Sequence, residues 1–233
     1  MPTVGVVLPA GGRGLRAGVP EPKQFLALRP GRPLFLYALE TFHRLDRVGA
    51  IALVLPPERL TAFSHLSRDW PKLRLVAGGA ERWESVRSGV QALESSLDYV
   101  LIHDAARPFV SRAVLGRCLA ALASDACVIA ALPAVDTIKQ VDGSAVRKTL
   151  DRRRLIQVQT PQAFPRPMLD ALYATPWKGE APSDEALMAE KAGFPVRWVR
   201  GAEANRKVTG SADVAWAGWM AGRLEAGEDI ADE

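Results

Sequence analysis

Short apolar runs rich in β-branched residues alternate along this chain with longer segments in which apolar residues recur at helical spacing. The apolar runs predict strands at Val4–Leu8, Ala50–Leu55, Leu73–Ala77, Tyr99–His103 and Cys127–Leu132. The periodic segments predict helices at Pro33–Leu45, Pro57–Leu66, Arg82–Ser95 and Ser111–Ala123. Nearly continuous hydrophobic strands that alternate with helices are typical of a parallel sheet with helices on both faces. The pattern therefore predicts a three-layer α/β fold with a mostly parallel sheet.

The alternation of strands and helices stops at about residue 135. The sequence Val141-Asp142-Gly143-Ser144 is a turn signal between alternating residues, so it predicts a β-hairpin that closes near Gln157 or Gln159. An arm of this kind, over about 136–158, is marginally stable alone and should pack on a domain of its own or on a second subunit. The remaining helices and strand are predicted at about 165–174, 184–192, Val196–Val199 and 211–224. We expect one domain over residues 1–233 that carries this arm.

Composition limits the kinds of protein that this chain can be. With 48% hydrophobic and 24% charged residues, the chain has the composition of an ordinary folded protein. Its net charge of +4 is mild and no broad basic stripe is visible, so a small anionic ligand is expected and nucleic acid is not. Two cysteines without metal-site spacing predict a reducing compartment. Since no signal peptide or long apolar run is visible, we expect a cytoplasmic protein that does not bind membranes.

The first predicted strand leads directly into the glycine-rich loop Pro9-Ala-Gly-Gly-Arg-Gly-Leu-Arg-Ala-Gly-Val-Pro-Glu-Pro-Lys-Gln-Phe25. Glycines in such a loop let backbone N–H groups approach a bulky anion. Arg13, Arg16 and Lys23 add cationic groups that suit phosphate oxygens. The combination is typical of a triphosphate-binding site. Since ligands of parallel sheets bind at the carboxyl ends of the strands, the segments 78–85 and 103–108, which follow two other strands, should join it.

Other interpretations of this loop are weaker. Gly12-x-Gly14-x-x-Ala17 fits the dinucleotide-binding fingerprint, but Gly18-Val-Pro20-Glu-Pro22 blocks the helix that should follow at once. The acidic residue of that fingerprint is also missing, because Glu40 falls in a predicted helix. A P-loop is excluded because no Gly-Lys-Ser/Thr follows at the required spacing. A glycine-rich turn with solvated arginines remains the alternative without a ligand.

Further motifs give the chain a family resemblance from about residue 4 to residue 220. They are Pro22-Lys-Gln-Phe25, Gly78-Gly-Ala-Glu-Arg82 with Ser85, His103-Asp-Ala-Ala-Arg-Pro108, Asp136-Thr137, Asp151-Arg152, Gln159-Thr-Pro-Gln162, Ser183-Asp-Glu185 and Lys207-Val-Thr209. On these motifs the chain resembles the 2-C-methyl-D-erythritol 4-phosphate cytidylyltransferase family of the non-mevalonate route to isoprenoid precursors. The glycine-rich loop alone indicates only the wider nucleotidyltransferase class.

The resemblance implies a Rossmann-like nucleotidyltransferase fold and a homodimer in which each arm hooks over its neighbour. It implies transfer of CMP from CTP to 2-C-methyl-D-erythritol 4-phosphate, which gives 4-diphosphocytidyl-2-C-methyl-D-erythritol and pyrophosphate. Arg16 and Lys23 are then the catalytic residues, with Mg²⁺ bound mainly through the CTP phosphates. The implied nucleotide-binding residues are Pro9, Ala10, Gly11, Gly12, Arg13, Gly14, Gly79, Ala80, Ser85, Asp104 and Ala105. The implied acceptor-binding residues are Arg107, Thr137, Arg152, Thr160, Ser183 and Lys207.

Several residues near the predicted sheet edge have a structural interpretation beside the functional one. Ser85 could be an exposed or back-bonded serine of its helix. Asp104 could cap a turn through the N–H groups that follow it. Arg107 could brace the Asp104 loop instead of binding substrate. His103 is expected to be packed at the end of its strand, since the transfer needs no imidazole base.

Structural alternatives also exist for the cations and for the segment near residue 183. Arg13 and Arg152 could be solvated arginines. Ser183 could be the N-cap of the next helix. The chain also departs from the family pattern at Ala204, where the family has an acidic residue, and this departure puts the local support of Lys207 in question.

Two rival functions remain open. A cytidylyltransferase of the same architecture that acts on ribitol 5-phosphate would differ only in its polyol pocket. A non-catalytic nucleotide-sensing or scaffold protein could have kept the fold. The presence of both Arg16 and Lys23 favours an enzyme, because binding alone could tolerate the loss of one.

Overall fold

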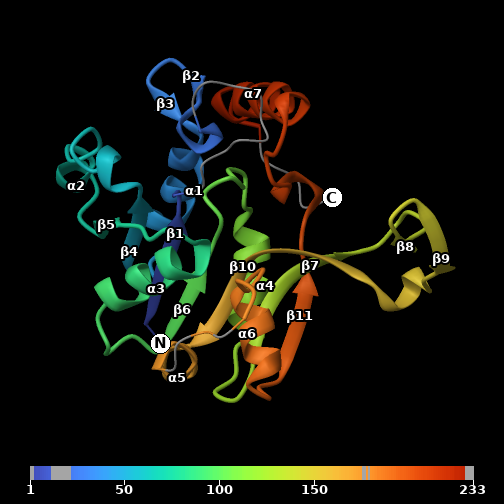
Figure 1. Cartoon of the computed structure of the whole chain (residues 1–233). Coiled ribbons are helices and arrows are strands. Elements are labelled where there is room, and N and C mark those ends of the chain that lie inside the picture. The colour runs from blue at the N-terminus through green and yellow to red at the C-terminus, as the bar shows by residue number, and fades with distance from the viewer. Residues whose placement is uncertain (1–2, 12–21, 175–176, 178, 229–233) are drawn as a thin grey trace.

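The computed structural model describes residues 3–11, 22–174, 177 and 179–228. Within these ranges one sheet has seven strands, in the order β11-β7-β10-β6-β1-β4-β5. They are β1 (Val4–Pro9), β4 (Val48–Leu55), β5 (Leu73–Ala77), β6 (Tyr99–Ile102), β7 (Cys127–Pro133), β10 (Ile156–Pro165) and β11 (Val196–Arg200). Only β10 is antiparallel to its neighbours among the strands so described. The predicted α/β fold with a mostly parallel sheet is confirmed, and Figure 1 shows helices on both faces.

The sheet has a hydrophobic core on each face, because successive side chains of a strand point to opposite sides. In β1, Val4, Val6 and Leu8 pack with α1 and α4, whereas Val7 packs with α3, α5 and α6. All four side chains are fully buried, and each such burial is worth about 1.5–3 kcal/mol. The helices are α1 (Leu34–His43), α2 (Leu66–Asp69), α3 (Arg82–Ala92), α4 (Arg112–Ala120), α5 (Arg166–Ala174), α6 (Glu185–Lys191) and α7 (Ser211–Glu225). None of the helices in the described ranges has both the length and the apolar character of a membrane span.

The contact between α3 and the sheet depends on Gly89. A β-carbon at this position would lie 2.5 Å from Cγ1 of Val7 and 2.9 Å from Cγ2 of Val54. A larger residue would push α3 away from β1 and β4, at a cost of about 1–3 kcal/mol. Because α3 begins at Arg82, this close packing also helps to place Arg82 at the edge of the sheet.

The predicted helix at Pro57–Leu66 is wrong. The chain there forms a short 3-10 turn, η2 (Pro57–Arg59), followed by further turns up to α2. The N–H of Leu66 donates to Phe63 O, three residues earlier. The apolar residues Leu60, Phe63 and Leu66 recur at every third position, a spacing that suits 3-10 turns better than an α-helix.

Strand β10 was not predicted from the sequence pattern. It lies inside the sheet between β6 and β7, although it contains Pro161 and the polar residues Gln159, Thr160 and Gln162. Its pairing with β7 shifts register between Val158 and Gln162, and this irregularity accommodates a proline within a sheet. The three polar side chains are buried, and they form hydrogen bonds to segments near the edge of the sheet.

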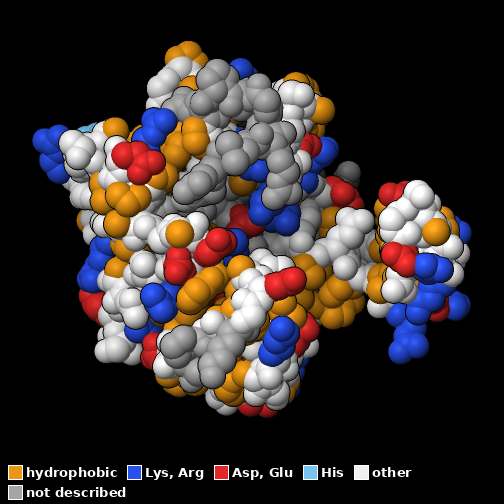
Figure 2. Space-filling model, viewed as in Figure 1, with side chains coloured by type: hydrophobic (Ala, Val, Ile, Leu, Met, Phe, Trp, Pro, Cys, Tyr) orange, Lys and Arg blue, Asp and Glu red, His pale blue; other side chains and the backbone are white. Residues whose placement is uncertain are grey.

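Two small hairpins lie outside the main sheet. They are β2 (Ala27–Arg29) with β3 (Arg32–Pro33), and β8 (Lys139–Asp142) with β9 (Ala145–Thr149). The second contains the predicted turn, and Gly143 in this turn has a φ of 55°. The predicted closure near Gln157 or Gln159 is wrong, because the hairpin ends at Thr149 and residues 156–158 pair within the main sheet as part of β10. The hairpin stands out from the body (Figure 1, Figure 2), and every residue of its two strands is exposed. Val141 and Val146 are 58% and 60% exposed, so apolar side chains on the arm face solvent in the single chain.

Candidate active site

Loops from three strands meet at the carboxyl edge of the sheet. The N–H of Ala105, after β6, donates to Pro9 O at the end of β1 (3.3 Å). The N–H of Gly78, after β5, donates to Leu55 O at the end of β4 (2.8 Å). Within the described residues, the starts of the segments after β1, β5 and β6 lie at one edge of the sheet, as predicted, while residues 12–21 of the first segment lie outside the described ranges.

Lys23 lies at this same edge. It begins the 3-10 turn η1 (Lys23–Phe25), in which the buried Gln24 donates from Nε2 to Ala10 O (2.7 Å). This bond ties the segment of Lys23 to the end of β1, next to the attachment of the Asp104 loop. Four other predicted residues of the glycine-rich loop lie outside the described residues: Gly12, Arg13, Gly14 and Arg16.

Ser85 holds the glycine turn after β5 against α3. Its hydroxyl accepts from the N–H of Gly79 (3.1 Å) and donates to Glu81 O (3.2 Å). A β-carbon at Gly78 would lie 2.9 Å from this hydroxyl, so the turn can approach Ser85 this closely only without a side chain there. The back-bonded interpretation of Ser85 is confirmed. The side chain is buried, and an ideal β-carbon on Gly11 would lie 3.5 Å from its oxygen.

The backbone of Ala10, a predicted base contact, forms hydrogen bonds inside the protein. Its N–H donates to a carbonyl of β4 (2.8 Å) and its own carbonyl accepts from Gln24. Among the other predicted base contacts that the structure describes, Gly79 and Ala80 are exposed and Gly11 is half-buried. A base contact through the backbone stays a prediction for these three positions, whereas both backbone groups of Ala10 already have partners in the protein.

Asp104 lies between two cations. Its Oδ2 accepts from Lys207 Nζ (2.6 Å), and its Oδ1 accepts from Nη2 (3.2 Å) and Nε (3.3 Å) of Arg82. Burial alone raises the pKa of Asp104, but the two cations hold this pKa well below its usual range. The carboxylate thus binds side-chain cations rather than capping a turn. Lys207 is paired with Asp104, so it does not depend on an acidic side chain at Ala204.

Arg82 also binds a second, deeper carboxylate. Its Nη1 donates to both oxygens of Glu185, at 3.0 and 2.8 Å. The Glu185 side chain is fully buried, and its Oε1 also accepts from the Tyr173 hydroxyl (3.3 Å). Burial raises the pKa of Glu185, against the opposing effect of Arg82. Charges of alternating sign thus run from the core to the surface, in the order Glu185, Arg82, Asp104 and Lys207.

A series of hydrogen bonds fixes the loop that carries Asp104. The N–H of Asp104 donates to Thr160 Oγ1 (3.1 Å), which also contacts Nδ1 of His103 (3.1 Å). Nε2 of His103 lies 2.9 Å from Arg107 O; because a carbonyl only accepts, Nε2 carries the proton and Nδ1 accepts from Thr160. Burial lowers the pKa of His103 to about 4, so the ring is neutral at neutral pH. His103 is packed as expected, and Thr160, a predicted acceptor contact, uses its hydroxyl within the protein.

Buried amides hold the segment that carries Lys207. Gln159 donates from Nε2 to Ala202 O (2.9 Å), and its Oε1 accepts from Asn205 Nδ2 (3.1 Å). Asn205 Nδ2 also donates to Thr160 O (2.7 Å). The position of Lys207 therefore depends on β10, which lies between β6 and β7.

Arg107 links three parts of the site. Its Nη1 donates to Asn205 O (2.8 Å) and its Nη2 donates to Val158 O (3.3 Å). The guanidinium thus connects the Asp104 loop with β10 and with the Lys207 segment. Of its two interpretations, the structure favours the brace.

Asp184, rather than Ser183, is the N-cap of α6. Its Oδ1 accepts from the N–H of Leu187 (2.9 Å), and its Oδ2 accepts from Gln162 Nε2 (2.8 Å). Gln162 Oε1 accepts from the N–H of Ala186 (3.2 Å), so β10 fixes the start of the helix. The capping interpretation of Ser183 is wrong, and its side chain is exposed next to the cap.

Thr137 and Arg152, the predicted acceptor contacts on the arm, are exposed. Arg152 begins the 3-10 turn η3 (Arg152–Arg154) and donates to Val135 O at the base of the arm. The arm extends away from the sheet (Figure 1). The single chain therefore does not bring these two residues to the cluster around Asp104.

Five polar or charged residues of this site are not among those expected from the sequence: Arg82, Gln159, Gln162, Glu185 and Asn205. The sequence signal for four of them is their place inside the family motifs, and Asn205 lies two positions before the motif that begins at Lys207. Such residues are buried only when they have partners. Their partners could not be identified without the fold.

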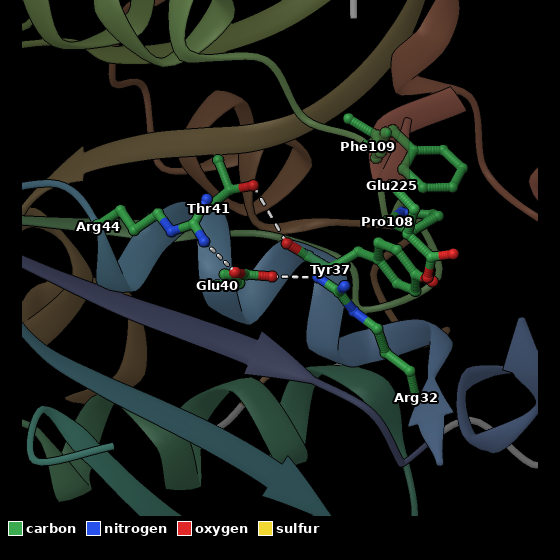
Figure 3. A pocket seen from close by; sticks show the side chains of 9 residues that line it. Arg32, Tyr37, Glu40, Thr41, Arg44, Pro108, Phe109 and Glu225 are labelled. Atoms are coloured by element: carbon green, nitrogen blue, oxygen red, sulfur yellow. Dashed lines mark hydrogen bonds and ion pairs between the residues drawn. The ribbon is translucent and has the colours of Figure 1, made fainter. Parts of the chain in front are cut away.

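A separate cavity of about 210 Å³ lies between α1, the end of α7 and Phe109 (Figure 3). Glu40 lines it and pairs with both Arg32 and Arg44. The Arg32 guanidinium lies 4.3 Å above the ring of Tyr37. None of the described lining residues belongs to the predicted site, and these charged groups already pair with one another.

The described residues contain no group of three or more His, Cys, Asp and Glu side chains that could hold a metal ion. Asp104 is a carboxylate at the sheet edge, and it is paired with two cations. Mg²⁺ takes oxygen ligands and is often bound by one or two carboxylates together with substrate phosphates. The residues present fit a metal ion that is held mainly by substrate phosphates, to which Asp104 would add a carboxylate.

The mostly parallel sheet has helices on both faces and the Asp104–Lys207 ion pair at its carboxyl edge. These features define an α/β protein of the kind that binds its ligands at this edge. The sequence model of the family described as 2-C-methyl-D-erythritol 4-phosphate cytidylyltransferase (IspD) matches residues 4–223. The chain therefore belongs to this family, and the resemblance drawn from its motifs is confirmed.

Individual relatives agree with this assignment. The chain is 37% identical over 230 residues to 2-C-methyl-D-erythritol 4-phosphate cytidylyltransferase of Frankia casuarinae, covering 98% of this chain and 85% of that protein. It is 41% identical over 214 residues to the bifunctional enzyme IspD/IspF of Anaeromyxobacter dehalogenans, covering 89% of this chain and 54% of that protein. The chain thus spans about half the length of the bifunctional relatives that it matches.

The fold also matches solved structures. For 2-C-methyl-D-erythritol 4-phosphate cytidylyltransferase of Thermus thermophilus, the TM-score is 0.74 at 30% identity, over 95% of this chain and 99% of that one. For 4-diphosphocytidyl-2C-methyl-D-erythritol synthase of Anaerococcus prevotii, the TM-score is 0.80 at 27% identity, over 95% and 99% of the two chains.

Proposed function

We propose that this chain transfers CMP from CTP to 2-C-methyl-D-erythritol 4-phosphate, hereafter the erythritol phosphate, and releases pyrophosphate. In a member of this family, the observation that carries the proposal is the Asp104–Lys207 pair at the carboxyl edge of the sheet. Lys207 is 39% exposed and offers a cation to the acceptor phosphate. Asp104 offers carboxylate oxygens to the hydroxyls of the polyol.

In this reaction an oxygen of the acceptor phosphate attacks the α-phosphorus of CTP, and the bond to pyrophosphate breaks on the opposite side. The developing negative charge lies on the α-phosphoryl oxygens and on the leaving group, so catalysis depends on positioning and electrostatic stabilisation. Lys23 and Arg16 supply the stabilising cations. Backbone groups of Gly11, Gly79 and Ala80 contact the cytosine, with Ser85 holding the Gly79 turn in place.

Mg²⁺ belongs to the same proposal. When bound to the triphosphate it supplies further positive charge for the phosphoryl oxygens. Asp104 is the described carboxylate that can orient such a complex, and Lys207 and Arg82 keep this carboxylate ionised.

The proposal includes a homodimer through the arm, within a single domain over residues 1–233. Val141 and Val146 are largely exposed on a two-stranded hairpin that has no core of its own. A two-fold dimer would cover these side chains and would bring Thr137 and Arg152 to the neighbour's acceptor site. One two-fold dimer would thus both cover the apolar side chains of the arm and complete the acceptor site.

A coupled assay of pyrophosphate release tests the activity. We expect release with CTP and the erythritol phosphate together, with an equal amount of the cytidylyl product by mass spectrometry. Either substrate alone should give none. Faster turnover of ribitol 5-phosphate would assign the chain to the rival cytidylyltransferase, and binding of CTP without turnover of either acceptor would support a nucleotide-sensing protein.

Arg152→Ala tests the shared acceptor site. We expect the KM for the erythritol phosphate to rise by about tenfold or more, because a hydrogen bond to a charged group is worth about 1.5–3 kcal/mol. The Kd of CTP should stay within about twofold. The matched control is Arg147→Ala, which removes an arm arginine that pairs with Asp142 within the hairpin. An equal rise in KM for both variants would contradict a specific role of Arg152.

Mixing Arg152→Ala with Lys23→Ala subunits then identifies the chain that each residue serves. If the arm completes the neighbour's site, a mixed dimer has one site with both residues intact, and activity should partly return. Subunit exchange is confirmed by native mass spectrometry of differently tagged chains. No recovery after complete exchange would mean that Arg152 serves its own chain.

A further inference from the structure

The pair Arg82–Glu185 lies beneath Asp104 and contacts neither substrate in the proposed reaction. We propose that Arg82 and Glu185 are positioning residues, which orient Asp104, and through it Lys207, for the acceptor. The catalytic part of this inference rests on the proposed function. The orientation of Asp104 by Arg82 and Glu185 is argued from the contacts between these side chains.

The shape of the Arg82 guanidinium determines where it holds Asp104. Arg82 Nη1 binds both oxygens of Glu185, while Nη2 and Nε bind a single oxygen of Asp104. Because the guanidinium is planar and rigid, its contacts with one carboxylate fix the direction in which it meets the other. Asp104 Oδ1 is thereby held, and Oδ2 is directed to Lys207.

Glu185 is itself firmly held. Its side chain has a relative exposure of 0%, and it accepts from the Tyr173 hydroxyl. It begins α6, whose first turn is tied to β10 through Gln162 and Asp184. Asp104 is therefore positioned relative to the sheet through Arg82 and Glu185.

A buried ion pair is often no more stabilising than an apolar pair of similar size, because desolvation offsets the attraction between the charges. Stability alone is thus a weak reason for placing Arg82 and Glu185 here. Orienting the adjacent Asp104–Lys207 pair would give the Arg82–Glu185 pair a function beyond stability.

The test compares single and paired substitutions. Arg82→Gln leaves the buried Glu185 carboxylate without its cation, and Glu185→Gln removes one of the two carboxylates that Arg82 binds, so both should lower the melting temperature. The paired variant Arg82→Gln with Glu185→Gln removes both charges and should recover most of that loss. We expect its KM for the erythritol phosphate to remain raised about tenfold or more, with the Kd of CTP within twofold of the wild type. Recovery of both stability and KM in the paired variant would overturn the proposal.

Arg82→Lys and Arg166→Gln are the matched controls. A lysine at position 82 keeps the charge but lacks the planar guanidinium. Compared with Arg82→Gln, Arg82→Lys should therefore recover more of the melting temperature than of the KM for the erythritol phosphate. Arg166 is a buried arginine near the opposite edge of the sheet, where it binds Asp170 and Glu94 O. Arg166→Gln should lower the melting temperature and leave this KM within twofold. A raised KM in Arg166→Gln would show that general destabilisation explains the effect, and would overturn the proposal.

A crystal structure of the paired variant separates this inference from the proposed function. We expect the Asp104 carboxylate to turn away from its present position, in which Oδ2 lies 2.6 Å from Lys207 Nζ. If the wild-type protein failed to transfer CMP but Asp104 moved in the variant, the proposed function would fail and the positioning would stand. If the wild type were active and Asp104 stayed in place, the positioning would fail alone.

Discussion

Replacing Lys23 by alanine is expected to lower kcat about a hundredfold to a thousandfold, or roughly 3–4 kcal/mol in the transition state. The reason is that the charge on the transferring phosphoryl group and on pyrophosphate grows as the reaction proceeds, so a cation at Lys23 binds the transition state more strongly than bound CTP. The Kd of CTP should therefore change much less than kcat. Arg16→Ala should behave in the same way.

The measurement is turnover at saturating CTP and acceptor, with the Kd of CTP from calorimetry. Lys72→Ala is the matched control, because Lys72 donates to His43 O and Leu45 O, each at 3.0 Å, and precedes β5 at the opposite end of that strand. It removes the same charge from the chain and should leave kcat within about twofold. Unchanged kcat in Lys23→Ala would show that Lys23 does not act on the transferring group.

CTP is expected to be preferred over UTP by a factor on the order of 10⁴ in kcat/KM. Cytosine and uracil differ in the 4-amino and 4-oxo groups, so a backbone donor or acceptor that pairs with one is left unpaired by the other. Gly11, Gly79 and Ala80 are the described positions whose backbone can make this distinction. The loss of binding free energy with UTP is large, because a backbone group that the bound base covers loses its hydration without gaining a hydrogen-bond partner.

Competition between the two nucleotides at equal concentration measures this ratio directly. Ser85→Ala removes the hydroxyl that accepts from the N–H of Gly79, so it should narrow the ratio by about fivefold, the equivalent of about 1 kcal/mol. Ser88→Ala is the control, since Ser88 lies one turn further along α3 and bonds only back to Glu84 O among the contacts described. Comparable kcat/KM values for CTP and UTP would rule out a cytosine-specific site.

The hydrophobic pattern was sufficient to predict most of the sheet, because burial of a strand on both faces requires a local run of apolar residues. Val4–Leu8 and Cys127–Leu132 are examples, and both lie in fully formed strands. The pattern failed at β10 because this strand buries Gln159, Thr160 and Gln162. Their polar groups are paired with loops that come from distant parts of the chain, so no local signal marks them as buried.

The motifs nominated Asp104 and Lys207 from residue type and family resemblance, and the structure brings the two together at 2.6 Å across 103 positions of sequence. The role of Arg82 could not be found in this way. Its two carboxylate partners lie in a loop after β6 and at the start of α6. Its contacts also depend on the close packing of α3 against the sheet, which Gly89 of this helix allows. Ser85 also had two interpretations until the position of Gly79 was known.

Residue types and their local spacing were enough to establish the class of fold, the family and the chemical character of the loops at the carboxyl edge of the sheet. These properties depend on which residues follow one another along the chain, so the amino-acid sequence determines them without the tertiary structure. The pairing of polar groups, in contrast, emerged only from the folded structure, as for Arg82 with Glu185 and for Thr160 with His103. The physical reason is that a buried charge or hydroxyl is stabilised by a specific partner at hydrogen-bond distance. That distance is set by the packing of helices and strands far apart in the sequence.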